Sequence, residues 1–149
     1  VERVVSSGHE IANHSLSHKH PDELDDAALA EQVVAAQRIF EDELGVKPVW
    51  YWPPYLARDA RLTPAAASVG IDLYDPRNLV DSKDYVREHN ADEIVRRATT
   101  GVSDGSVILF HEWRAETAER LPEILDVLTE QGCEFLTFSE LHRKSQTSE

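Results

Sequence analysis

Short apolar runs alternate with longer amphipathic segments along the chain, and this alternation restricts its fold more than any other feature. The predicted strands are residues 49–52, 71–74, 106–110 and 134–138, and the predicted helices are residues 25–44, 63–70, 90–98 and 117–130. Strands that alternate with helices pair in parallel, because each helix carries the chain back to the start of the sheet. The sequence therefore predicts an α/β fold with a mainly parallel sheet, to which residues 8–13 add another buried strand.

Charge and composition exclude several classes of protein. The chain has 28 acidic and 15 basic residues and a net charge of −13, so a nucleic-acid partner is not expected. No apolar run approaches the length of about 18 residues that a membrane span needs, and no signal-peptide pattern opens the sequence. Cys133 is the only cysteine, which excludes an internal disulfide and a cysteine-based zinc site.

Two histidines, four positions apart, are the first candidate site. His14 and His18 follow the predicted strand 8–13, and a helical or tightly turned segment can present both imidazoles on one side. Zinc binds neutral imidazole readily. Surface histidines also produce this spacing by chance, so a metal pair and two unrelated surface side chains both remain open on the spacing alone.

Polar and aromatic residues follow each of the later strands. Trp52 and Tyr55 flank two prolines after the strand 49–52, Asp84 and Tyr85 lie in an acidic loop, and His111 directly follows the strand 106–110. Catalytic groups in parallel α/β folds gather where strands end. Each motif also has a purely structural interpretation: a rigid aromatic loop, a solvated turn, or a core histidine bonded to backbone.

Taken in order, these motifs resemble the polysaccharide deacetylases of carbohydrate esterase family 4, the NodB-homology domains, over residues 4–141. His14 and His18 match the metal motif, and residues 52–55 match an Arg-Pro-Pro-Tyr motif in which Trp52 replaces the arginine. Residues 81–85 resemble the Asp-x-x-Asp-Trp motif, with Tyr85 at the tryptophan position. Residues 109–111 match the Leu-x-His motif.

The resemblance implies a fold, a reaction and a role for each motif residue. The fold is a distorted (β/α) barrel, and the reaction is removal of acetyl groups from a polysaccharide with the help of a divalent metal, Zn²⁺ or alternatively Co²⁺ or Ni²⁺. His111 is the general acid, and Asp84 orients it. The remaining roles are metal binding by His14 and His18, and substrate binding by Trp52, Tyr55, Tyr85 and Leu109.

The chain also departs from the family pattern. The family's first strand ends in Thr-Phe-Asp-Asp, which supplies a catalytic base and a third metal ligand, and no such strand occurs here. We therefore expect an incomplete barrel without its first two strands, formed by residues 1–142 and followed by a polar tail at 143–149. The expected consequences are negligible activity of this chain alone and possible self-association through the open sheet edge.

The resemblance further implies an acetylated polysaccharide of the chitin, peptidoglycan or xylan type as substrate, and an extracellular or cell-envelope location. Amide hydrolases outside carbohydrate chemistry share the fold. The alternative function is a carbohydrate-binding pseudoenzyme that stacks sugars on Trp50, Trp52, Tyr55 and Trp113; a structural domain without ligand is a third. A last prediction is geometric: His111 lies beside Asp84, which the loop after the strand 71–74 carries.

Overall fold

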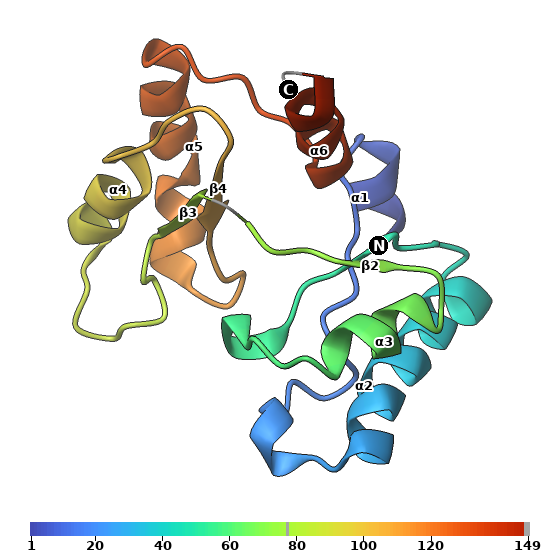
Figure 1. Ribbon diagram of the computed structural model, residues 1–149. Coiled ribbons are helices and arrows are strands. Elements are labelled where there is room, and N and C mark those ends of the chain that lie inside the picture. The colour runs from blue at the N-terminus through green and yellow to red at the C-terminus, as the bar shows by residue number, and fades with distance from the viewer. Residues whose placement is uncertain (77, 148–149) are drawn as a thin grey trace. The chain divides into compact units, whose positions relative to one another are not determined.

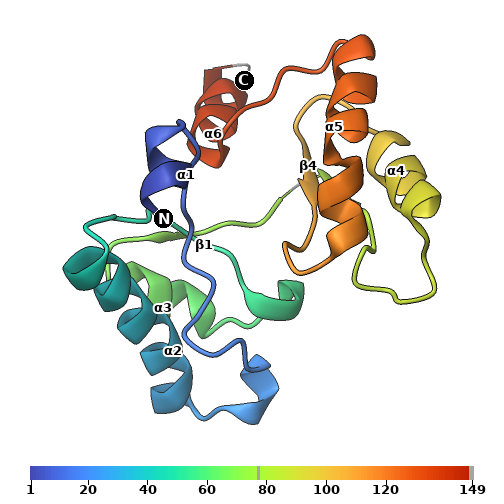
Figure 2. The ribbon, with the colours of Figure 1, turned by 180° about the vertical axis from the view of Figure 1, so that it is seen from behind.

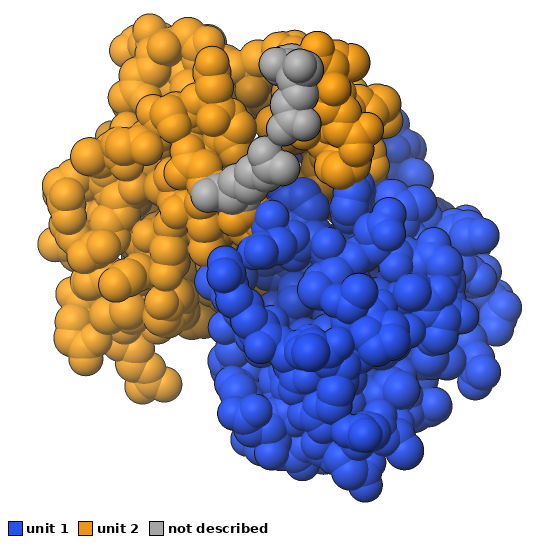
Figure 3. Space-filling model, viewed as in Figure 1, with its two compact units in different colours: residues 1–75 blue, residues 76–149 orange. Residues whose placement is uncertain are grey.

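The computed structural model describes residues 1–76 and 78–147, and it divides into two compact units (Figure 1). Unit 1 comprises residues 1–75 and unit 2 residues 76–149, coloured separately in Figure 3. Within the described residues, no helix has both the length and the apolar character that a membrane crossing needs.

Unit 1 is built on two short parallel strands, β1 and β2, and on the helices α2 and α3, which lie side by side (Figures 1 and 2). Its elements are α1 (Glu2–Ser6), the 3-10 turn η1 (Pro21–Glu23), α2 (Asp26–Arg38), the π-helical turn η2 (Ile39–Glu43), β1 (Trp50–Tyr51), the 3-10 turn η3 (Pro54–Leu56), α3 (Leu62–Ala67) and β2 (Asp72–Leu73).

The longest helix of unit 1 follows directly from its sequence. Asp25 caps α2, because its carboxylate accepts a hydrogen bond of 2.8 Å from the backbone N–H of Ala28. Leu29 and Val33, one turn apart, are buried against Tyr51 of β1. These contacts, with Leu62, Ala65, Ala66 and Ile71, form the hydrophobic core of unit 1.

Unit 2 repeats the parallel pairing with a second pair of strands and three helices. Its elements are β3 (Asn78–Asp81), α4 (Ala91–Thr99), β4 (Ser106–Leu109), α5 (Ala115–Glu130) and α6 (Phe138–Thr147). Asn90 caps α4 through a 2.9 Å bond from the backbone N–H of Glu93. α4 and α5 pack through Ile94, Ala98, Ile124 and Leu128, with Ile108 and Phe110 against this core.

The predicted helices and the strands 49–52, 71–74 and 106–110 are confirmed, but two predicted strands are wrong. Residues 8–13 contribute only an isolated parallel bridge between Asn13 and Tyr51. Residues 134–138 form no strand, because Thr137 and Glu140 close a capping box and start α6 at Phe138. The predicted tail is therefore helical as far as Thr147, and its residues 148–149 lie outside the described part.

The sequence also missed β3, which pairs with β4 in the register Asp81 to Leu109. β3 has only two apolar residues, Leu79 and Val80, between polar ends, so no apolar run marks it. Within residues 1–76 and 78–147, the assigned strands form two separate parallel pairs and no closed barrel.

Candidate functional site

His14 and His18, two of the four histidines of unit 1, lie next to each other on an exposed turn. Their ring centroids are 4.9 Å apart, in an edge-on arrangement. Nδ1 of His14 is 2.6 Å from the backbone carbonyl oxygen of Trp52. Because a carbonyl can only accept, we assign the proton of the neutral ring to Nδ1 and its lone pair to Nε2. A backbone carbonyl fixes metal-binding histidines in the same way.

The backbone of this turn adopts the left-handed conformation at Ser15 (φ 70°) and His18 (φ 55°), which costs energy outside glycine. Asn13 holds it in place. Its side-chain oxygen accepts from the backbone N–H of Ser15 at 3.1 Å, and its Nδ2 donates to the carbonyl of Val33 and to Oε1 of Gln37. Asn13 is completely buried, so the turn is anchored to α2.

Tyr55 is the exposed aromatic residue beside the histidine pair. Its ring centroid lies 4.8 Å from that of His18 and 5.2 Å from that of His20. It also has a left-handed backbone (φ 59°), after the two prolines that end β1. This arrangement brings the predicted substrate residue Tyr55 to the predicted metal ligand His18, and it adds His20, which the sequence did not single out.

The side chain of Trp52, which stands where the resembled motif has an arginine, packs against the ring of Tyr74. The rings of Trp52 and Tyr74 are stacked, with centroids 5.6 Å apart and planes at 24°. Trp50 meets the same Tyr74 ring edge-on, and Trp50 is only 7% exposed. Trp50 is therefore no stacking surface for a sugar, and that part of the alternative prediction is wrong.

The histidine pair supplies part of a metal site. Two imidazoles, one of them fixed by a carbonyl, fit two positions of a zinc coordination sphere, and protein zinc sites use three or four such ligands. Within residues 1–76 and 78–147, no group of three or more His, Cys, Asp or Glu side chains is arranged to hold a metal ion. His14 and His18 therefore account for two ligands at most among the described residues.

In unit 2, His111 and Asp84 lie side by side as predicted. Nδ1 of His111 is 2.7 Å from Oδ1 of Asp84. The Asp84 carboxylate is completely buried, while the His111 side chain is 31% exposed. A carboxylate can only accept, so Nδ1 carries the proton. The pair thus presents an imidazole to solvent from a fixed, buried support.

Two further donors hold the same carboxylate. Oδ2 of Asp84 accepts from the backbone N–H of His111 at 2.7 Å and from the hydroxyl of Thr117 at 2.9 Å. Thr117 lies in the first turn of α5, and no motif in the sequence marks it. Ser82 completes the arrangement, since its hydroxyl donates to the carbonyl of Leu109 at 2.6 Å and ties the loop to the end of β4.

The reason for the Asp84 contact differs from the predicted one. Its loop follows β3 rather than the strand 71–74, and β3 is the direct parallel neighbour of β4. The paired residues Asp81 and Leu109 are the last of their strands, so both following segments leave at the same end of the pair. His111 and Asp84 are therefore brought together by strand register.

Two exposed aromatic side chains flank the His111 ring. The centroid of Tyr85 is 5.5 Å away, edge-on, and that of Trp113 is 5.7 Å away. Tyr85 also donates from its hydroxyl to Oδ2 of Asp81 at 3.1 Å. Partial burial and this hydrogen bond raise the pKa of Tyr85, so its hydroxyl remains a donor at neutral pH. The predicted substrate residue Leu109 is half-buried at the end of β4.

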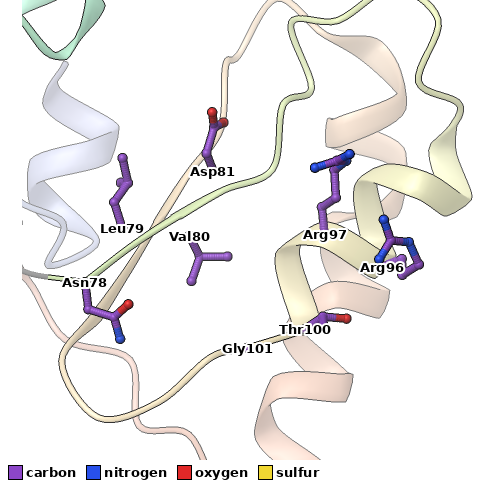
Figure 4. A pocket seen from close by; sticks show the side chains of 8 residues that line it. All are labelled: Asn78, Leu79, Val80, Asp81, Arg96, Arg97, Thr100 and Gly101. Carbon is purple, nitrogen blue, oxygen red and sulfur yellow. The ribbon is translucent and has the colours of Figure 1, made fainter.

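Unit 2 also has an open pocket between β3 and α4 (Figure 4). Arg96 and Arg97 both pair with Glu93, which offsets part of their charge. None of the predicted site residues lines this pocket. Its lining consists of Asn78, Leu79, Val80, Asp81, Arg96, Arg97, Thr100 and Gly101.

Comparison with known proteins points to one family. The polysaccharide deacetylase family model matches residues 1–74. The peptidoglycan-N-acetylglucosamine deacetylase PgdA of Listeria monocytogenes is 28% identical over 142 residues, which are 95% of this chain and 29% of PgdA. The chain therefore spans about a third of the length of such curated relatives.

Solved structures agree with this similarity. The peptidoglycan deacetylase PdaC of Bacillus subtilis matches with a TM-score of 0.84 and 29% identity, over 99% of this chain and 70% of that one. A family 4 acetyl xylan esterase from Clostridium thermocellum, in complex with a cobalt ion, matches with a TM-score of 0.79 and 28% identity, over 93% of this chain and 66% of that one.

Proposed function

Because the chain belongs to the polysaccharide deacetylase family, we propose that it is a metal-dependent hydrolase domain that removes acetyl groups from an N- or O-acetylated polysaccharide. The observation that carries the proposal is the contact between His111 and the buried Asp84. A half-exposed imidazole on a buried carboxylate is suited to proton transfer near neutral pH.

His111 is the proposed general acid. Its Nδ1 proton is bound to Asp84, so the acid is the doubly protonated ring, which transfers its Nε2 proton to the departing amine or alcohol and becomes neutral. Asp84 orients the ring and stabilises it when it is positively charged. Tyr85 and Leu109 are the proposed contacts of the acetyl group in unit 2, and Tyr55 and Trp52 are those of the substrate in unit 1.

His14 and His18 are the proposed ligands of a divalent metal, for which imidazole chemistry favours zinc, with cobalt or nickel as substitutes. The metal supplies Lewis-acid polarisation of the acetyl carbonyl. The described residues place no acidic side chain as a third ligand with this pair. We therefore infer that the chain by itself binds metal weakly and has negligible hydrolytic activity.

The names of the relatives support a proposal for the substrate class. Their names specify peptidoglycan and xylan, polymers of acetylated sugars. We propose an acetylated polysaccharide of the peptidoglycan, chitin or xylan type for this domain, and an extracellular or cell-envelope location. Self-association through an open sheet edge remains a prediction, which sedimentation would test.

The experiment measures acetate release from peptidoglycan, chitooligosaccharides and acetylated xylan. It compares the gene product that contains this sequence, the 149-residue chain, and the His111→Ala variant of each. We expect the gene product to release acetate, to lose activity with a chelator, and to lose at least 100-fold in the variant. The chain alone should release far less. Equal rates for the gene product and its His111→Ala variant would show that His111 is not the general acid.

The second candidate is a carbohydrate-binding domain without activity. It is favoured by the incomplete ligand set and by the exposure of Tyr55 and Trp113, which are 60% and 59% exposed. It predicts that the gene product releases no acetate from any of the three substrates, while oligosaccharide still changes the fluorescence of the protein and the Trp113→Phe variant reduces that change.

A further inference from the structure

Thr117 is a buried hydroxyl that none of the proposed catalytic steps uses. It lies in the first turn of α5, is 5% exposed, and donates from Oγ1 to Oδ2 of Asp84 at 2.9 Å. It is 33 positions from Asp84 in sequence. The hydrogen bond therefore connects α5 directly to the carboxylate that holds the proposed acid.

The hydrogen bonds of Asp84 explain what this connection does. Oδ1 accepts from Nδ1 of His111, and Oδ2 accepts from both the backbone N–H of His111 and Thr117. Two donors from different elements, the end of β4 and the start of α5, fix Oδ2. Rotation of a carboxylate about its terminal torsion is otherwise broad. Because two donors hold Oδ2 of Asp84, its other oxygen, Oδ1, is kept facing the imidazole of His111.

The helix adds to the effect of the hydroxyl. α5 has 16 residues, and its first turn carries partial positive charge that favours a nearby carboxylate. Thr117 is in that turn and contacts the carboxylate itself. The same side chain thus supplies a direct hydrogen bond and places Asp84 at the positive end of a helix.

We propose that Thr117 is a positioning residue, which sets the orientation of the His111 ring by fixing Asp84. The inference rests on the proposed role of His111 as proton donor. The competing explanation is that Thr117 matters only as a packed methyl group. The two explanations predict opposite rankings for Thr117→Ser, which keeps the hydroxyl, and Thr117→Val, which keeps the branched shape.

The test follows the Nδ1 proton of His111 by NMR in the full 149-residue chain. In the wild type, this proton should exchange slowly with water, because it is bound to a buried carboxylate. We expect Thr117→Val to speed its exchange about tenfold, since a hydrogen bond to a charged group is lost, and Thr117→Ser to stay within about twofold of wild type. Thr129→Val is the matched control, because its hydroxyl bonds only within α5, to the carbonyl of Leu125.

A second pair of variants decides the question if Thr117→Val folds poorly. Thr117→Ala and Thr117→Ser both lack the methyl group and differ only in the hydroxyl, so faster exchange in the alanine variant alone supports positioning. Exchange that is unchanged in both Thr117→Val and Thr117→Ala, or equally fast in Thr117→Ser, would overturn it.

A kinetic measurement separates this inference from the proposed function. In the gene product, Thr117→Val should lower kcat for acetate release about tenfold and leave KM unchanged, because the substrate does not contact Thr117. If the wild type releases no acetate, the proposed function fails, whereas the exchange rates of the His111 proton still decide the role of Thr117.

Discussion

The two histidine arrangements of this chain are held in different ways. In unit 2, the His111 ring binds directly to a buried carboxylate that three donors fix. In unit 1, His14 and His18 are exposed on a left-handed turn, and the buried polar residue beneath them, Asn13, bonds to backbone and to the Gln37 side chain rather than to an imidazole. Unit 2 thus holds its imidazole on a fixed, buried carboxylate, while the pair in unit 1 lies on a fixed turn with no third side chain arranged for a metal ion among the described residues.

This difference indicates where each histidine is sensitive to substitution. Removing the support of His111 leaves buried donors without an acceptor, which costs stability as well as orientation. The His14 side chain is exposed, so its removal leaves no large buried surface uncovered. Its effect should therefore appear in metal binding and not in stability. Three predictions examine this contrast, beginning with the largest effect.

Asp84→Ala should destabilise unit 2 strongly. The Thr117 hydroxyl and the backbone N–H of His111 would lose their acceptor in a buried site, at a cost of about 3–5 kcal/mol in free energy of unfolding. His14→Ala should cost unit 1 less than about 1 kcal/mol. Urea unfolding, followed through the amide signals of Ile124 and Val33, measures the two units separately. Similar losses in both variants would contradict the contrast.

Alkaline pH should destabilise unit 1 more than unit 2, and the residue responsible is Tyr51 rather than a histidine. Burial raises the pKa of Tyr51 to about 12, against 10 in the unfolded chain. The folded form therefore keeps a proton that the unfolded form loses above pH 10. Stability present below pH 10 falls between pH 10 and 12, by roughly 3 kcal/mol.

The Tyr51→Phe variant is the control for this pH effect, because it has no phenol to ionise. The alkaline loss of unit 1 should be much smaller in this variant, and the part that remains is that of Tyr74, whose pKa burial also raises. The Tyr85 hydroxyl in unit 2 has a raised pKa as well, but that residue is 43% exposed and should contribute little. An equal alkaline loss in wild type and Tyr51→Phe would disprove the assignment.

Asn13→Ala should weaken zinc binding although Asn13 is not a ligand. Without its side chain, Ser15 loses the acceptor that holds the left-handed turn, so His14 and His18 are no longer presented together. Loss of such outer support typically lowers metal affinity 10- to 100-fold. Calorimetric titration with zinc should show this loss, a similar one in His14→Ala, and wild-type affinity in His9→Ala, which alters an exposed histidine outside the pair.

Local patterns in the sequence were sufficient for the helices α2 to α5 and for three of the four assigned strands, but not for α1 or α6. Asp25 and Asn90 cap the helices they were expected to start, and apolar spacing identified the buried face of α2. The Thr137–Glu140 capping box was equally local but was missed, because the apolar run before it resembled a strand. The polar ends of β3 left no periodic signal, so that strand is defined by its pairing with β4.

The sequence by itself identified His14, His18, Asp84 and His111 as functional candidates, because short motifs preserve residue type and spacing. It could not determine that Asp84 follows the neighbour of β4, that Trp50 is buried, or that Thr117 reaches the same carboxylate. Those facts depend on strand register and on the rotational position of α5, which residues far apart in the sequence fix together. Tertiary packing alone decides which donors meet a buried acceptor, because each must lie within about 3 Å of it.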